Sequence, residues 1–150
     1  MGKRLLLVDD EATLVRAMGR LLRRAGYDVF LAGNCDEARR ASGSFSLGVF
    51  DIDLPDGDGI TLAEGLTAGG AVRRAIFFSS TSDESLRARA SRLGVFIDKS
   101  RGFPTLYATI ELALASQQAK VVGAEETRFR DSSDPPPSGV RESGKQSRRD

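Results

Sequence analysis

The amino-acid sequence predicts an α/β protein in which a doubly wound, five-stranded parallel sheet carries helices on both faces. Short apolar segments alternate five times with longer segments whose apolar residues recur at helical spacing. The short segments are apolar throughout, which is typical of parallel strands buried on both faces. The right-handed crossover rule then leaves few ways of connecting such a sheet.

The first part of the chain holds two strand–helix pairs. An unbroken run of leucine and valine at 5–8 predicts a buried strand that two aspartates stop. Apolar residues at helical spacing between arginines predict an amphipathic helix over 11–25, which Gly26 ends. A second strand follows at 27–31, and a short helix over 34–42 begins at an asparagine that can cap it.

Two further pairs occupy the middle of the chain. The strand predicted at 47–51 leads to a helix marked by apolar residues over 60–66, whose propensity nearby glycines lower. A fourth strand at 75–78 runs into four consecutive serine and threonine residues. The fourth helix is then predicted over 83–93.

The last pair is a strand at 95–97 and a helix over 103–118. Beyond it apolar residues become scarce and three prolines stand together among serine, glycine and charges. We therefore predict one folded domain over 1–119 and a disordered, polar and proline-rich tail over 120–150.

Composition excludes several classes of protein. The chain of 150 residues has a formal net charge of +1, so no overall field favours nucleic acid or a membrane surface. The apolar stretch at the start is too short for a signal peptide or a membrane span. Cys35 is the only cysteine and histidine is absent, which excludes an intramolecular disulfide and argues against zinc. We expect a cytoplasmic protein with no direct nucleic-acid or membrane partner.

Polar side chains follow four of the five predicted strands. Asp9 and Asp10 come after the first, Asp51 ends the third, Ser79 follows the fourth and Lys99 follows the fifth. Each residue alone is explained as a helix cap, a turn residue or a solvated charge. Because the carboxyl ends of parallel strands meet at one edge of the sheet, the five together predict a functional site.

The residue types at this edge favour phosphoryl chemistry. Three carboxylates in one place repel each other, and oxygen ligands without histidine or cysteine favour Mg²⁺. A carboxylate such as Asp51 can attack phosphorus and form an aspartyl phosphate. Lys99 would hold phosphate oxygens, and Ser79 would offer a hydroxyl hydrogen bond.

Four segments in this order resemble the receiver domain of two-component response regulators: LLLVDDE at 5–11, VFDIDLPDGDG at 49–59, IFFSS at 76–80, and Lys99. The resemblance covers about residues 3–118 and implies a flavodoxin-like (βα)5 fold with strand order 2-1-3-4-5. It implies a signalling phosphoacceptor that catalyses only its own phosphorylation and dephosphorylation.

The resemblance also assigns the metal site. It implies that Asp51 is the phosphoacceptor and that Asp10 and Asp51 bind Mg²⁺ directly. The backbone carbonyl of Asp53 would be a third protein ligand, and Asp9 would act through water.

The remaining roles follow in the same way. By resemblance Ser79 is the switch hydroxyl, Phe96 lies near the switch aromatic, and Lys99 is the phosphate-binding lysine. Because the chain has no histidine, the phosphoryl donor would be a phosphohistidine on a partner histidine kinase or histidine phosphotransfer protein.

The sequence departs from the family at several positions. Ser100 stands where a proline, often joined by a cis bond, usually follows the lysine, so we expect a trans Lys99–Ser100 bond. The segment from Gly94 to Lys99 is about two residues shorter than usual. Asp98 introduces a carboxylate beside Lys99, and strand alternation places it on the same face as Phe96.

These features predict a stand-alone response regulator that signals to a downstream protein through a phosphorylation-dependent surface on its fourth helix, fifth strand and fifth helix. A phosphorylation-dependent homodimer is a further expectation. One alternative is a pseudo-receiver that interacts without phosphorylation, to which the altered Lys99 segment lends support. The other is a haloacid-dehalogenase-like phosphatase using Asp51 and Asp53 as its DxD motif, although that family places DxD on its first strand.

Overall fold

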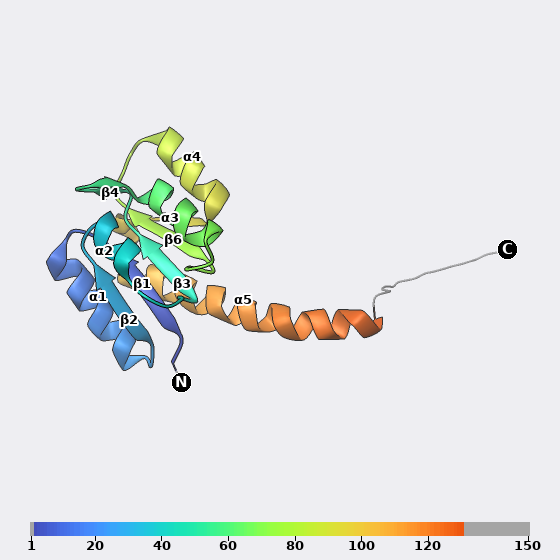
Figure 1. Cartoon of the computed structure of the whole chain (residues 1–150). Coiled ribbons are helices and arrows are strands. Elements are labelled where there is room, and N and C mark those ends of the chain that lie inside the picture. The colour runs from blue at the N-terminus through green and yellow to red at the C-terminus, as the bar shows by residue number, and fades with distance from the viewer. Residues whose placement is uncertain (1, 131–150) are drawn as a thin grey trace. The chain divides into compact units, whose positions relative to one another are not determined.

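The computed structural model describes the backbone of residues 2–130 (Figure 1) and the side chains of residues 2–116. The chain divides into two compact units, Met1–Leu112 and Ala113–Asp150. The first unit holds the whole sheet and every residue that the sequence assigns to the site. The fold below is that of the first unit unless α5 is named.

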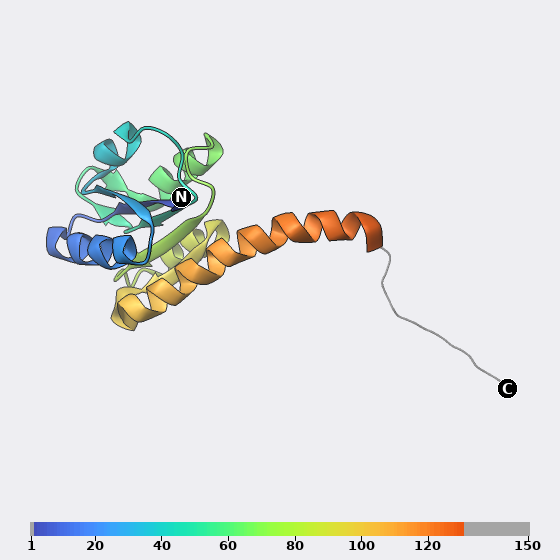
Figure 2. The same ribbon diagram turned by 90° about the horizontal axis from the view of Figure 1, so that it is seen from below.

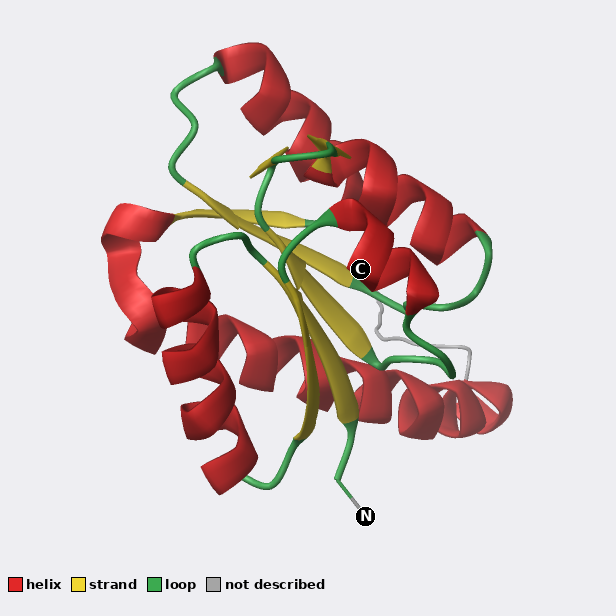
Figure 3. Cartoon of the chain, turned by 60° about the vertical axis from the view of Figure 1, so that its left-hand side comes forward, coloured by secondary structure: helices red, strands yellow, loops and turns green. Residues whose placement is uncertain are grey.

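Five parallel strands form the sheet (Figure 3). They are β1 Arg4–Val8, β2 Asp28–Ala32, β3 Leu47–Phe50, β6 Ala75–Ser79 and β7 Val95–Asp98. Their order is β2-β1-β3-β6-β7. The strands β4 and β5 form a separate small hairpin, so β6 and β7 are the fourth and fifth strands of the main sheet. The order is therefore 2-1-3-4-5, as predicted, and the doubly wound fold is confirmed.

Helices cover both faces of the sheet (Figure 2). They are α1 Ala12–Arg24, α2 Cys35–Arg40, α3 Gly59–Ala68, α4 Glu84–Leu93 and α5 Gly102–Arg130. The helices α2, α3 and α4 share one core cluster with alternate strand residues, among them Leu6, Phe50 and Phe77. The opposite face carries α1 and the first turns of α5, where Leu22 and Leu106 are fully buried.

The strands are as apolar as two-sided burial requires. Leu5, Leu6 and Leu7 are all 0% exposed, because successive side chains point to opposite faces and both faces are covered. Each such side chain contributes about 1.5–3 kcal/mol of burial free energy. This packing holds the carboxyl ends of the strands at fixed positions.

Side-chain caps set where the helices begin. The predicted cap Asn34 accepts a hydrogen bond from the Glu37 N–H at 2.8 Å. Asp58 caps α3 through the Ile60 N–H, and Asp83 caps α4 through the N–H groups of Ser85 and Leu86. The helix starts that the sequence predicted at residues 34 and 83 are therefore confirmed.

Two features differ from the prediction. Asp53–Leu54 (β4) and Gly57–Asp58 (β5) form an antiparallel hairpin across the Pro55 turn, where only a loop was expected. The last helix runs to Arg130 rather than ending near residue 118. Alanine, glutamate and arginine, which favour helix, recur past residue 118, and the next proline after Pro104 in the first turn is Pro135. The first part of the predicted tail is thus helical, and residues 131–150 lie outside the described residues.

The hairpin returns to the sheet at Gly59, which begins α3 directly against the strand end. The Gly59 N–H donates to the Ile52 carbonyl at 2.8 Å, and a Cβ atom at Gly59 would overlap the carbonyl oxygen of Asp51. Only glycine allows this close approach, so Gly59 fixes the backbone that carries the Asp51 carboxylate.

Replacing Gly59 with alanine should therefore lower the free energy of unfolding by about 1–3 kcal/mol, because the added methyl group meets backbone rather than a flexible side chain. Gly65→Ala in the same helix is the matched control. A Cβ there meets no atom within 4 Å, so this change should stabilise by up to about 1 kcal/mol. Urea unfolding measures both, and equal effects of the two substitutions would contradict this account.

Candidate functional site

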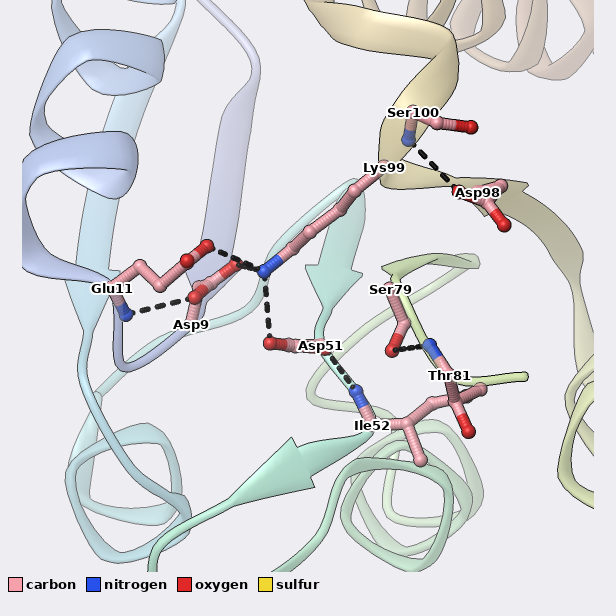
Figure 4. Close-up of polar contacts among 9 residues, drawn as sticks. All are labelled: Asp9, Glu11, Asp51, Ile52, Ser79, Thr81, Asp98, Lys99 and Ser100. Atoms are coloured by element: carbon pink, nitrogen blue, oxygen red, sulfur yellow. Dashed lines mark hydrogen bonds and ion pairs between the residues drawn. The ribbon is translucent and has the colours of Figure 1, made fainter. Parts of the chain in front are cut away.

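The carboxyl edge of the sheet brings together the acidic residues that the sequence singled out, of which Figure 4 shows Asp9 and Asp51. Asp9 and Asp10 follow β1, and Asp51 follows the adjacent strand β3. Ligand oxygens of the three carboxylates lie within 4.8 Å of one another. Asp9 and Asp51 are 3% and 7% exposed, whereas Asp10 is open to solvent. Two buried carboxylates and one exposed carboxylate suit a divalent cation that enters from solvent.

Lys99 compensates this negative charge from the other side of the site. Its Nζ atom lies 2.9 Å from Asp9 Oδ2, 3.0 Å from Asp51 Oδ2 and 2.8 Å from Glu11 Oε1. Burial opposes the charge, yet the hydrogen bonds to Glu11, Asp9 and Asp51 raise the pKa of Lys99 above its ordinary value. Lys99 is therefore a fixed ammonium despite the shortened segment that carries it.

Glu11 is the residue that sequence reasoning missed. It belongs to the LLLVDDE segment, where the sequence pattern gives it no role, and its side chain is 60% exposed. Its position directly after the acidic pair was the only available signal. In the structure its carboxylate accepts a hydrogen bond from the Lys99 ammonium, in addition to the contacts that Lys99 makes with Asp9 and Asp51.

The two buried aspartates have different partners. Asp9 uses both oxygens: Oδ1 accepts the Glu11 N–H at 2.9 Å, and Oδ2 pairs with Lys99. Burial raises the pKa of Asp9 above its ordinary value, although these two partners work against the shift. Asp51 Oδ1 accepts the N–H of Ile52 at 2.8 Å, and its other oxygen pairs with Lys99.

Asp10 is the carboxylate best placed to accept a cation. Among the described residues no hydrogen bond or ion pair is recorded for its side chain, so nothing has to be displaced. Asp53 lies in β4 with an exposed side chain. The candidate ligands for a cation, the three aspartate carboxylates and the Asp53 carbonyl, are all oxygen atoms, which a hard cation such as Mg²⁺ prefers.

Ser79 reaches the same edge but does not join the charged cluster. It is 1% exposed at the end of β6, and its Oγ accepts the Thr81 N–H at 3.4 Å (Figure 4). Phe96 lies one strand further out, paired in register with Phe77 and half-buried. The structure thus assembles the three aspartates and Lys99, and places Ser79 and Phe96 beside them.

The segment after β7 explains how Lys99 is delivered. Lys99–Arg101 form a short 3-10 turn capped by Asp98, whose Oδ1 accepts the Ser100 N–H at 2.9 Å. The described residues contain no cis peptide bond, so the expected trans Lys99–Ser100 bond is confirmed. A proline at position 100 could not donate this hydrogen bond.

A family model, the response regulator receiver domain, matches residues 5–111. The chain belongs to this family. Receiver domains are signalling phosphoacceptors rather than enzymes that turn over a separate substrate, which agrees with the coarse function that the sequence predicted. The haloacid-dehalogenase interpretation is accordingly not retained.

Curated relatives of this receiver domain are much longer proteins. The sensor protein TorS of Escherichia coli is 38% identical over 96 residues, which cover 61% of this chain and 10% of TorS. The transcriptional regulatory protein DpiA of the same organism is 34% identical over 96 residues, covering 61% of this chain and 42% of DpiA. The chain therefore spans less than half the length of either relative.

Solved structures show the same receiver fold. A response regulator receiver domain protein (CheY-like) from Methanospirillum hungatei superposes with a TM-score of 0.72 at 26% identity, covering 80% of this chain and 99% of that one. The response regulator TrrA of Thermotoga maritima, solved in complex with Mg(2+)-BeF, gives a TM-score of 0.65 at 24% identity, covering 74% and 98%. This second likeness supports the fold alone.

Within residues 2–130, no helix of the receiver is both long and apolar enough to cross a membrane.

The exposed carboxylate of Asp10 leads to a test of the metal site. Mg²⁺ should raise the free energy of unfolding, by about 1.4 kcal/mol at ten times its dissociation constant. In Asp10→Asn this Mg²⁺ effect should largely disappear, while the metal-free protein should become more stable because one of three repelling charges is gone.

Asp53→Asn is the matched control. If Asp53 contributes its backbone carbonyl, this variant should keep most of its stabilisation by Mg²⁺. Thermal unfolding with and without Mg²⁺ measures both variants, and an undiminished Mg²⁺ effect in Asp10→Asn would contradict the site.

Proposed function

We propose that this receiver accepts a phosphoryl group on Asp51 from the phosphohistidine of a partner histidine kinase or phosphotransfer protein, in a reaction that depends on Mg²⁺. One observation carries the proposal: the Asp51 carboxylate directly follows a buried strand, contacts the Lys99 ammonium and lies beside the acidic pair Asp9 and Asp10. A carboxylate in this position can act as an oxygen nucleophile, because the Lys99 ammonium and a bound Mg²⁺ would stabilise the negative charge of the incoming phosphoryl group.

The reaction needs few parts. An Asp51 oxygen attacks phosphorus, an O–P bond forms, and the P–N bond to the donor imidazole breaks. Lys99, already 3.0 Å from Asp51, moves onto a phosphoryl oxygen as a point charge. Glu11 keeps a hydrogen bond to the same ammonium and so retains Lys99 at the site.

Bound Mg²⁺ would supply further positive charge for the phosphoryl oxygens. Asp10, Asp51 and the backbone carbonyl of Asp53 would hold it, with Asp9 acting through water. This assignment is supported by the all-oxygen donor set and by Asp10, whose carboxylate has no recorded partner within the described side chains.

Ser79 would report the phosphoryl group to the rest of the domain. Its Oγ accepts a hydrogen bond from Thr81, so the hydroxyl hydrogen is available for a phosphoryl oxygen. If the Ser79 hydroxyl turned toward Asp51, it would draw the β6–α4 loop inward and let Phe96 change its rotamer. The negative charge added at Asp51 would in this way alter a surface some distance away.

The output surface would be the exposed side of α4, β7 and the start of α5. Val95 is 49% exposed there, and the exposed Arg101 adds positive charge to the region. A downstream protein with an acidic face would fit this surface, as would a phosphorylation-dependent homodimer. Stand-alone action and a cytoplasmic location remain predictions.

The pseudo-receiver alternative rested on the altered Lys99 segment. In the structure the shortened segment still brings the ammonium onto Asp51 and Asp9. The geometry therefore favours a phosphoacceptor over a module that works through its surface alone.

The first test uses acetyl phosphate or a phosphorylated histidine kinase. With Mg²⁺ the chain should gain one phosphoryl group that alkali and hydroxylamine remove, and beryllofluoride should perturb NMR signals around Asp51. Chelation of Mg²⁺ or Asp51→Asn should abolish both responses. Labelling that persists in Asp51→Asn, or that ignores Mg²⁺, would refute the proposal.

A second prediction concerns how long the phosphoryl group survives. The exposed Asp53 carboxylate lies two residues past the acceptor, where it can accept a hydrogen bond from a water that attacks the acyl phosphate. Asp53→Asn should lengthen the half-life about two- to tenfold, less than a fully positioned general base provides.

Glu84→Gln, at an exposed position in the first turn of α4, is the control and should leave the half-life as it is. Loss of labelled phosphate over time measures both variants. A half-life unchanged or shortened by Asp53→Asn would contradict this role.

A further inference from the structure

One side chain on α4 contacts both segments that the proposed switch must move. The Arg87 guanidinium donates through Nε to the Thr81 carbonyl at 2.9 Å and through its second terminal nitrogen to Asp98 Oδ2 at 2.6 Å. Its central carbon lies 5.0 Å from the centroid of the Phe96 ring. We call these contacts with Thr81, Phe96 and Asp98 the Arg87 bridge.

The bridge joins the surroundings of Ser79 to those of Lys99. Thr81 follows Ser79 by two residues, and its N–H donates to Ser79 Oγ. Asp98 precedes Lys99 and caps the turn that carries it, through the Ser100 N–H. One planar guanidinium with several donors thus ties the two loops together, which a lysine could not do in the same geometry.

Two departures from the family are explained by this arrangement. Ser100 supplies the N–H that the usual proline lacks, and Asp98 uses one oxygen for that N–H and the other for Arg87. The hydrogen bond from the Ser100 backbone, and then the nearby Arg87 charge, lower the pKa of the Asp98 carboxyl. Asp98 thus connects the Ser100 backbone to the Arg87 side chain.

We propose that Arg87 is a positioning residue that restrains the switch: it holds the loop after Ser79 and the turn carrying Lys99 in their ligand-free arrangement. This inference rests on the proposed function, because it concerns regulation of the same site.

The direction of the effect follows from what must move. For Ser79 to reach a phosphoryl group on Asp51, the backbone at Thr81 must shift, while Arg87 fastens its carbonyl. For Phe96 to change rotamer, its ring must leave the guanidinium that lies over it. A contact made only in the ligand-free state opposes binding, so its removal tightens binding.

Beryllofluoride binding in the presence of Mg²⁺ provides the first test. Arg87→Gln and Asp98→Asn should each bind about three- to tenfold more tightly than the native chain, the range expected for one partly exposed charged hydrogen bond. Asn at position 98 keeps an acceptor for Ser100 while losing the charge. The double variant should gain no more than either single variant, because both remove the same contact.

Arg92→Gln is the matched control, since Arg92 is exposed on the same helix and no contact is recorded for it among the described residues. Its affinity should equal that of the native chain. A merely structural Arg87 would lose stability and bind more weakly. Unchanged or weaker binding in Arg87→Gln would overturn the proposal.

A second measurement needs no phosphoryl analogue. In the ligand-free protein, amide hydrogen exchange should become several-fold faster in both 79–82 and 96–101 in Arg87→Gln, and in neither segment in Arg92→Gln. Exchange that is unchanged, or that changes in one segment only, would overturn the bridge. If the native chain failed to bind beryllofluoride, the proposed function would fail, and exchange would still decide the bridge.

Discussion

The balance of charge around the Lys99 ammonium is the constraint on which the site depends. Asp9 and Asp51 are almost fully buried, and two carboxylates at that depth repel each other unless a cation lies between them. Lys99 contacts both, and Glu11 holds the ammonium from the solvent side. A divalent cation or a phosphoryl group bound at this site, as proposed, would take over part of this charge balance.

The rest of the fold keeps these charges in place. Apolar packing on both faces fixes the ends of β1 and β3, from which Asp9 and Asp51 extend. Gly59 lets α3 begin against the Asp51 carbonyl, and Asp58 caps that helix while pairing with Arg89 of α4 at 3.0 Å. The site is therefore linked to α3 and α4 by backbone contact and by ion pairs.

Asp98 and Ser100, two departures from the family pattern, lie on either side of Lys99. Asp98 caps the turn through the N–H of Ser100, which stands where the family usually has proline, and Arg87 connects that turn to the loop after Ser79. The shortened segment still delivers Lys99 because the 3-10 turn begins directly at the end of β7. These residues thus preserve the contacts of Lys99 while adding a link between the loop after Ser79 and the turn that carries Lys99.

The strands, the helix starts at Asn34 and Asp83, and the meeting of Asp51 with Lys99 are predictable from the amino-acid sequence, since all depend on local patterns and on the geometry of parallel sheets. The contacts of Glu11 with Lys99, and of Arg87 with Asp98 and Thr81, emerge only when the chain is folded. Such contacts join residues on different elements whose charges, read along the chain, look like ordinary solvated surface. Their partners depend on side-chain placement that no periodicity encodes.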